Sequence, residues 1–179
     1  KKTIFKVENK TNNKLKISSF NKILITFIGL LFLYLFYLLI PILYDNNWVK
    51  DNIQTKLHRE FKLNLKSIEN ISYRILPAPH FLIKDSNLLS NIPSSEKSIA
   101  EIRDLKIFLS QLNFLDKEKM RIKKVTINNA NFFLLRNDLK ELNNSTNQEF
   151  SNKKVIVNKS NIFFKDNLDE IITIIKIDK

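Results

Sequence analysis

The chain of 179 residues contains no cysteine and only one glycine, Gly29. Without cysteine it can form no disulfide, no thiolate zinc site and no thiol nucleophile. A chain with one glycine can form neither a P-loop nor a dinucleotide-binding turn, because in both the backbone must approach phosphate closely. The two histidines, His58 and His80, are widely separated, which argues against a histidine-rich metal site. These absences exclude nucleotide-dependent enzymes, and neither a metal nor a cofactor is predicted.

Candidate catalytic residues are equally scarce. Neither histidine has a catalytic partner at a recognisable spacing, so both are expected at the surface. Asp166, Asp169 and Glu170 are close in sequence, but acidic residues gathered around a turn are usually solvated and lack a surrounding catalytic signature here. The sequence therefore predicts a protein that is not an enzyme.

One long uncharged run, residues 23–44, is typical of a transmembrane helix. At about 1.5 Å per residue this run would span about 33 Å, compared with roughly 30 Å for the hydrocarbon core of a bilayer. A cleaved signal peptide has a shorter apolar core and a small-residue cleavage site, whereas here the run ends in Tyr44-Asp45-Asn46-Asn47. The sequence predicts a single-pass membrane anchor, with Tyr44 and Trp48 at the membrane–water interface.

The flanking charges predict the orientation of this anchor. Residues 1–22 contain seven lysines and one glutamate, a net charge of +6, whereas residues 45–60 carry no net charge. Positively charged flanks stay in the cytoplasm. Residues 1–22 are therefore expected to be a cytoplasmic tail in the inner membrane of a bacterium, with the bulk of the chain in the periplasm. Half of the net charge of +12 is in this tail, so no nucleic-acid partner is predicted.

Beyond the anchor, the hydrophobic periodicity predicts a short helix followed by a sheet. Val49, Ile53 and Leu57 would form the apolar face of an amphipathic helix over residues 45–61, capped by Asp45 or a following asparagine. From residue 62 onward the period changes to two, the pattern of β-strands. The alternating apolar residues are Ile71, Tyr73, Ile75, Phe81, Ile83, Leu105, Ile107, Leu109, Val125, Ile127, Val155 and Val157, followed by a run at 171–177. The predicted fold is mainly β, a meander over residues 62–179 with a polar loop at 143–152.

An internal repeat lies in the second half of the chain. Residues 123–135, KKVTINNANFFLL, align with residues 153–165, KKVIVNKSNIFFK, at an offset of 30. A fixed period of this length indicates that one supersecondary unit is stacked, although a chance match in a chain rich in lysine and asparagine is the alternative. If the repeat is structural, Val125 and Val155 should share a buried environment, whereas Thr126 should face solvent.

The order of these features resembles the start of proteins of the AsmA family. The most specific pieces are the turn Pro77-Ala78-Pro79 leading into FLIKD at 81–85, and the unit VTINNANFFLLRND at 125–138. The resemblance covers roughly residues 23–138 and continues more loosely through the repeat to 166. The chain departs from the family pattern in one turn, because the usual glycine is absent near residues 61–63.

This resemblance implies a curved antiparallel sheet of the repeating β-groove type, similar to TamB. Residues 62–179 would form such a groove domain or the start of a longer one. Such proteins are linked to outer-membrane biogenesis and to phospholipid passage between two membranes. The twelve alternating residues named above would then line an apolar groove for lipid. Two alternatives remain open: a lipopolysaccharide-export component similar to LptC, and a membrane-tethered scaffold that binds a protein partner by strand addition.

Overall fold

The computed structural model describes residues 18–66, 68–90, 97–136, 153–166 and 168–178. Contacts within the chain divide it into two compact units, residues 1–36 and 37–179. Most of the predicted basic tail and the predicted polar loop at 143–152 lie outside the described residues.

The predicted apolar run is a helix. Helix α1 (Ser19–Leu39) continues into a short 3-10 turn, η1 (Ile40–Leu43). Together they form one stretch of 25 residues, within which a window of 18 residues has a mean hydropathy of 2.7. Pro41 lies in η1, where α1 ends because proline cannot donate the next helical hydrogen bond. By length and composition this stretch can cross a membrane.

The predicted amphipathic helix is α2 (Asn46–Phe61). Its first turn is capped by Asp45, whose side chain accepts a hydrogen bond from the Trp48 backbone amide at 2.8 Å. Val49, Ile53, Leu57 and Phe61 are the buried residues of this helix. The amphipathic pattern is thus confirmed, with an additional buried residue at the last position.

Lys62 ends α2 in a left-handed conformation, with φ of 57°. This is the position after a helix where glycine is most common, since glycine adopts positive φ without steric cost. The backbone amide of the next residue, Leu63, donates to the Leu57 carbonyl at 3.1 Å and so closes the turn. Lysine therefore occupies the turn in which the family's glycine is missing, at a conformational cost of about 1 kcal/mol.

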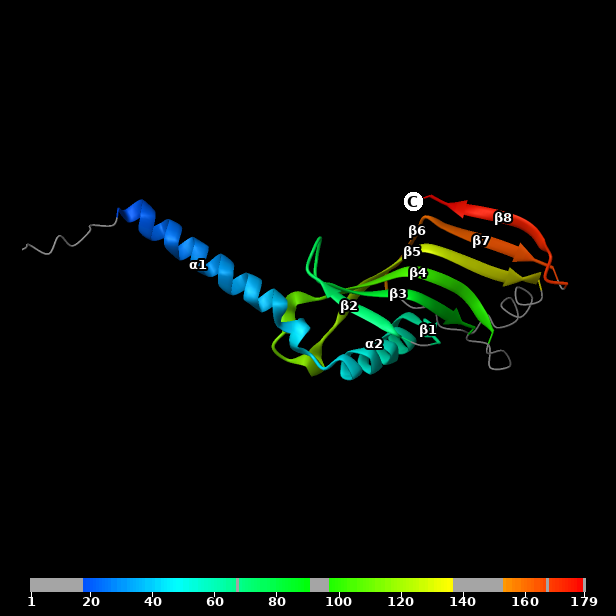
Figure 1. The fold of residues 1–179 in the computed structure, drawn as a ribbon, viewed down its shortest axis with the longest axis horizontal. Helices are drawn as coiled ribbons and strands as arrows, with labels where there is room; N and C mark the ends of the chain where they lie inside the picture. The colour runs from blue at the N-terminus through cyan, green and yellow to red at the C-terminus, as the bar shows by residue number, and fades with distance from the viewer. Residues whose placement is uncertain (1–17, 67, 91–96, 137–152, 167, 179) are drawn as a thin grey trace, which may run out of the picture. The chain divides into compact units, whose positions relative to one another are not determined.

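Eight strands form one open, curved sheet (Figure 1). The strands are β1 (Asn64–Leu65), β2 (Asn70–Arg74), β3 (His80–Leu89), β4 (Ser98–Leu109), β5 (Ile122–Leu135), β6 (Val155–Asn158), β7 (Ser160–Lys165) and β8 (Ile171–Ile177). Their order across the sheet is β1-β3-β4-β5-β7-β8, while β2 pairs with β3 and β6 pairs with β5. The mainly β fold is confirmed, and the predicted break at residues 77–79 separates β2 from β3.

The sheet is mixed, whereas the sequence predicted antiparallel pairing throughout. Strands β6 and β7 both run parallel to β5. Val125 lies opposite Val155 and Asn131 opposite Asn161, so the pairing register equals the 30-residue offset of the repeat. The two copies thus pair side by side in the same direction, which a meander would not allow. The repeat is structural, and the parallel pairing follows from it.

Matching residues of the two copies interact across this register. Asn158 Nδ2 donates to Asn128 Oδ1 and Asn161 Nδ2 donates to Asn131 Oδ1, each at 3.0 Å, and the rings of Phe133 and Phe163 stack at 5.6 Å. Each pair forms only if like residues lie opposite each other. The repeated sequence therefore specifies the register of the parallel strands.

A third copy of the repeat, which the sequence analysis missed, lies in β3. Residues 83–87, IKDSN, correspond to INNAN at 127–131 and VNKSN at 157–161. Each copy has a residue with left-handed φ at the same place, followed by a small buried residue: Asp85-Ser86, Asn129-Ala130 and Lys159-Ser160. Such positions kink a strand locally, and here they recur at one level across the sheet.

Candidate functional site: the apolar inner face of the sheet

One face of the sheet, called here the inner face, carries rows of apolar residues that cross the strands. Ile83, Leu105, Ile127 and Val157 lie opposite one another in one such row, on β3, β4, β5 and β6. The alternation of apolar residues that the sequence predicted is therefore present in β3, β4, β5 and β6.

The predicted groove residues differ in exposure. Seven of them are buried in the core, at 4% exposure or less: Phe81, Ile83, Leu105, Ile107, Leu109, Val125 and Ile127. Four are partly buried and pack against that core: Ile71, Tyr73, Ile75 and Val157. The last, Val155, is 37% exposed. Lipid binding by these twelve residues stays a prediction.

Two expectations about the repeat were wrong. Val125 is 0% exposed and Val155 is 37% exposed, although they occupy matching positions. The reason is that β5 has β4 on its other side, whereas β6 pairs with β5 alone among the described strands. Thr126, expected to face solvent, is only 8% exposed because it lies on a central strand between Lys106 and Ile156.

Helix α2 packs against the first part of the inner face. Val49, Ile53, Leu57 and Phe61 are at most 3% exposed and belong to the same hydrophobic cluster as the buried residues of β3, β4 and β5. Over these strands the inner face is therefore closed by a helix. Burial of this kind stabilises the fold by about 1.5–3 kcal/mol for each large aliphatic side chain.

The inner face continues beyond this core onto β7 and β8. Phe132 on β5 lies opposite Ile162 on β7, and Ile162 lies opposite Ile175 on β8. Phe132 and Ile162 are partly buried, and Ile175 is 48% exposed. This apolar surface, defined by Phe132, Ile162 and Ile175, is called the open part of the inner face.

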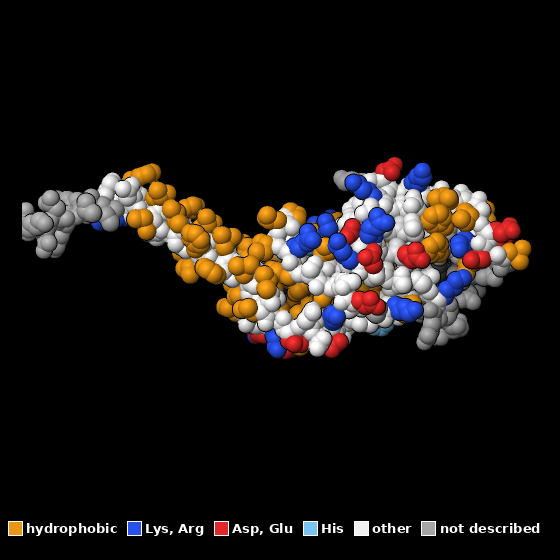
Figure 2. Space-filling model, viewed as in Figure 1, with side chains coloured by type: hydrophobic (Ala, Val, Ile, Leu, Met, Phe, Trp, Pro, Cys, Tyr) orange, Lys and Arg blue, Asp and Glu red, His pale blue; other side chains and the backbone are white. Residues whose placement is uncertain are grey.

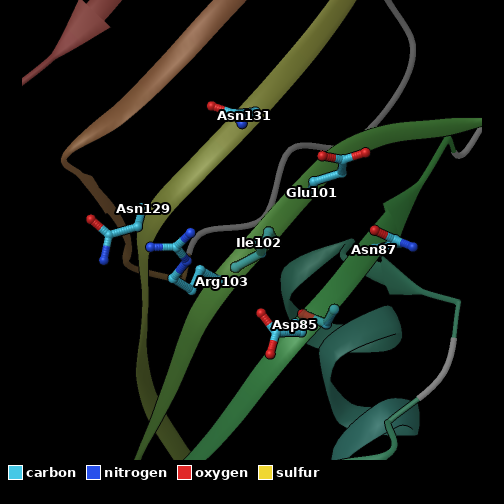
Figure 3. A pocket seen from close by; sticks show the side chains of 8 residues that line it. Asp85, Asn87, Glu101, Ile102, Arg103, Asn129 and Asn131 are labelled. Atoms are coloured by element: carbon cyan, nitrogen blue, oxygen red, sulfur yellow. The ribbon is translucent and has the colours of Figure 1, made fainter.

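The opposite face carries a polar pocket of about 290 Å³ at the level of the kinks. Its side chains come from three neighbouring strands (Figure 3): Asp85 and Asn87 from β3, Glu101 and Arg103 from β4, Asn129 and Asn131 from β5. Asn129 Nδ2 donates to Asp104 Oδ2 at 3.3 Å. In the part of the chain that the structure describes, no group of three or more His, Cys, Asp or Glu side chains could hold a metal.

His80 is buried, at 2% exposure, whereas His58 is exposed. The His80 ring stacks on Phe108 at 5.0 Å, and its Nδ1 lies 2.7 Å from the Ala78 carbonyl oxygen. Burial is the main reason why the pKa of His80 is lowered, and the nearby positive charge of Lys106 acts in the same direction. The prediction of a surface residue was wrong for His80, since β2 and β4 flank it on both sides. A buried neutral imidazole bonded to a backbone carbonyl has a structural role.

Three tyrosines join the end of the apolar stretch to the sheet. Tyr37 donates to the Gln111 carbonyl, Tyr44 to the Phe114 carbonyl at 2.6 Å, and Tyr73 to the Leu38 carbonyl at 2.7 Å. Burial raises the pKa of the Tyr73 hydroxyl, which stays protonated as a donor. These contacts link residues far apart in sequence, and no local pattern could have predicted them.

The predicted interfacial residues Tyr44 and Trp48 lie next to each other. Both are partly buried, and their rings pack edge to face at 5.7 Å between centroids. The amino group of Lys117 lies 5.3 Å from the centre of the Trp48 ring. Contact of these two rings with the membrane interface stays a prediction.

Comparison with known proteins identifies the family. The model of the AsmA family matches residues 17–169, which include the apolar stretch, α2 and most of the sheet. A search of curated proteins and a search of solved structures each gave no significant match. AsmA is not a known enzyme family. The chain therefore belongs to the AsmA family, and this membership suggests a membrane-anchored protein with a role in outer-membrane biogenesis.

Proposed function

We propose that this protein is anchored in the bacterial inner membrane and carries phospholipid toward the outer membrane along the inner face of its sheet. The N-terminal tail would lie in the cytoplasm and the sheet in the periplasm. Three features support this proposal: the family, the apolar stretch Ser19–Leu43, and the lysines that precede it.

The open part of the inner face is the observation that carries the proposal. Its residues are apolar and accessible, and they continue the row of side chains that α2 covers over β3 to β5. Transfer of an acyl chain from water to an apolar surface gains about 0.8 kcal/mol for each buried methylene. A face of this kind can hold acyl chains while the headgroup stays in water.

Helix α2 limits where lipid binds first. Because α2 already fills the inner face over β3 to β5, lipid would enter there only by displacing its side chains. The accessible site in this structure is therefore on β7 and β8. We expect initial lipid contact at Ile162 and Ile175, and little contact at Ile127, which is 2% exposed.

A photo-crosslinking residue placed at Ile162 in cells should capture phospholipid. The same residue at Asn161, which is the neighbouring position and points to the opposite face, is the matched control and should capture little. At Ile127 the crosslinker should capture α2 instead. Capture of protein alone at both Ile162 and Ile175 would contradict lipid transport by this segment.

The orientation of the anchor is tested with single cysteines in this naturally cysteine-free chain. Asn12→Cys reports on the N-terminal tail and Leu168→Cys on the β7–β8 turn, where Leu168 is 81% exposed. In intact spheroplasts an impermeant thiol reagent should label position 168 and leave position 12 unlabelled. The reverse pattern would show that the sheet is cytoplasmic.

A scaffold role is the second candidate, favoured by the edge of β8. This strand is last in the sheet order, and Ile171, Ile172, Ile174 and Ile175 are 47–60% exposed. An apolar edge strand is a template for pairing with another chain. In the crosslinking experiment, a scaffold would give one discrete protein adduct from β8 and no lipid from Ile162.

A further inference from the structure

Two leucines in the connection between β4 and β5 are exposed. Leu112 is 83% exposed and Leu115 is 82% exposed, whereas Phe114 between them is 1% exposed. Leu112 belongs to the short turn η2 (Gln111–Asn113). Phe114 packs in the core of the unit, but the two leucines add nothing to that core. Exposed apolar side chains that gather in one region form a surface that an apolar partner can cover.

This connection is attached to the residues at which the apolar stretch ends. Tyr37 donates to the Gln111 carbonyl and accepts a hydrogen bond from the Phe114 amide, and the rings of Tyr37 and Phe114 stack at 5.6 Å. Tyr44 donates to the Phe114 carbonyl at 2.6 Å. Leu112 and Leu115 are sequence neighbours of these bonded residues, so the hydrogen bonds hold their backbone near the end of the apolar stretch.

The turn between β2 and β3 adds a third exposed leucine at the same end of the unit. Leu76 is 81% exposed. Three residues before it, Tyr73 donates to the Leu38 carbonyl at 2.7 Å. Three residues after it, the Pro79 carbonyl accepts from the Leu109 amide at 3.0 Å, which ties the turn to the end of β4.

We infer that Leu76, Leu112 and Leu115 insert into the surface of the phospholipid bilayer at the side where the membrane span ends. The last residues of the span, Ile42 and Leu43, are 56% and 85% exposed and would meet lipid there. The three leucines, called here the membrane-contact leucines, extend that apolar surface sideways. Figure 2 shows hydrophobic side chains gathered at this end of the unit.

The neighbouring polar chemistry fits the same partner. Trp48 is partly buried, and Lys117 Nζ lies 5.3 Å from the centre of its ring. Tryptophan is enriched where a protein meets lipid headgroups, and lysine is attracted to anionic lipid phosphates. A bilayer surface offers acyl chains to the leucines and phosphates to the lysine. The surface formed by the membrane-contact leucines, Trp48 and Lys117 therefore fits a bilayer as its partner.

The consequence is that the sheet is docked on the membrane and does not move freely on a tether. The end of the sheet at which β4 ends and β5 begins is held against the lipid. This inference rests on the anchor and not on lipid transport, so either proposal can fail alone.

The test uses the full chain reconstituted in vesicles of phosphatidylethanolamine and phosphatidylglycerol. Three single-cysteine variants, Leu76→Cys, Leu112→Cys and Leu115→Cys, are labelled with the environment-sensitive fluorophore NBD. Leu168→Cys is the matched control, because Leu168 is an equally exposed leucine, at 81%, in the β7–β8 turn. Lipids that carry a quenching nitroxide on the acyl chain are then added to the vesicles.

Emission at positions 76, 112 and 115 should be shifted to the blue and quenched several-fold more than emission at position 168. Equal emission and equal quenching at all four positions would overturn the inference. Trp48 fluorescence of each variant shows whether the unit is folded. Quenching at the membrane-contact leucines without phospholipid capture at Ile162 would refute transport and leave the docking inference intact.

Discussion

Replacing Val125 by aspartate should lower the free energy of unfolding by about 3–5 kcal/mol, whereas Val155→Asp should cost about 1 kcal/mol or less. The two valines occupy the same place in the repeat and lie opposite each other. Val125 is 0% exposed, so a carboxylate there would lose its water without a partner, whereas Val155 is 37% exposed. The difference between the two losses of unfolding free energy therefore measures the effect of burial at matching positions of the repeat.

Urea unfolding of the full chain in detergent, followed by the fluorescence of its single tryptophan, measures this difference. Trp48 lies in the first turn of α2 and packs against the core. Lys123→Asp, at an exposed position on β5, is the control for the added charge and should leave the unfolding midpoint nearly unchanged. Equal losses at positions 125 and 155 would show that β6 is covered as fully as β5.

Leu57→Ala should destabilise the unit by about 2–5 kcal/mol, because the side chain is fully buried and its loss leaves a cavity. Leu57 belongs to the part of α2 that closes the inner face over β3 to β5. The variant should therefore also loosen this helix. In the crosslinking experiment, we expect Ile127 to gain phospholipid capture when Leu57 is shortened.

His58→Ala is the matched control, since His58 is the next residue of the same helix and is exposed. It should change neither the stability nor the crosslinking pattern. If Leu57→Ala lost less than about 1 kcal/mol, α2 would contribute little to the core. The contrary result is a large loss of stability in Leu57→Ala with unchanged phospholipid capture at Ile127. That result would show that lipid does not displace α2 from the inner face.

Most local structure followed from the sequence because it depends on near neighbours. The spacing of Val49, Ile53 and Leu57 predicted a helix, and the period of two predicted the strands that follow it. The parallel pairing of β5 with β7 could not be read in this way, since strand direction depends on where the chain returns. The repeat contained that information, because pairing Asn128 with Asn158 and Asn131 with Asn161 at one constant offset requires parallel strands.

The exposure of individual site residues was less predictable. Alternation places Val125 and Val155 on one face, but only the strand order shows that one is central and the other lies on β6. His80 has no sequence signature of burial, and its ring is enclosed by stacking on Phe108 from the next strand. The third repeat copy was missed because it shares only an asparagine, Asn87, with both other copies at its kink.

Disulfide formation between β5 and β7 tests most directly the central claim that repeat copies pair side by side in a 30-residue register. The double variant Asn131→Cys and Asn161→Cys places two thiols on the same face of adjacent strands, and neighbouring strands lie about 4.8 Å apart. Mild oxidation of the full chain should join them. The control pair, Asn131→Cys and Ile162→Cys, points to opposite faces and should stay reduced. The contrary result is rapid disulfide formation in the control pair and none between positions 131 and 161. It would show that the pairing register of β5 and β7 is shifted by one residue. Such a shift would exchange the two faces of β7 and contradict the account.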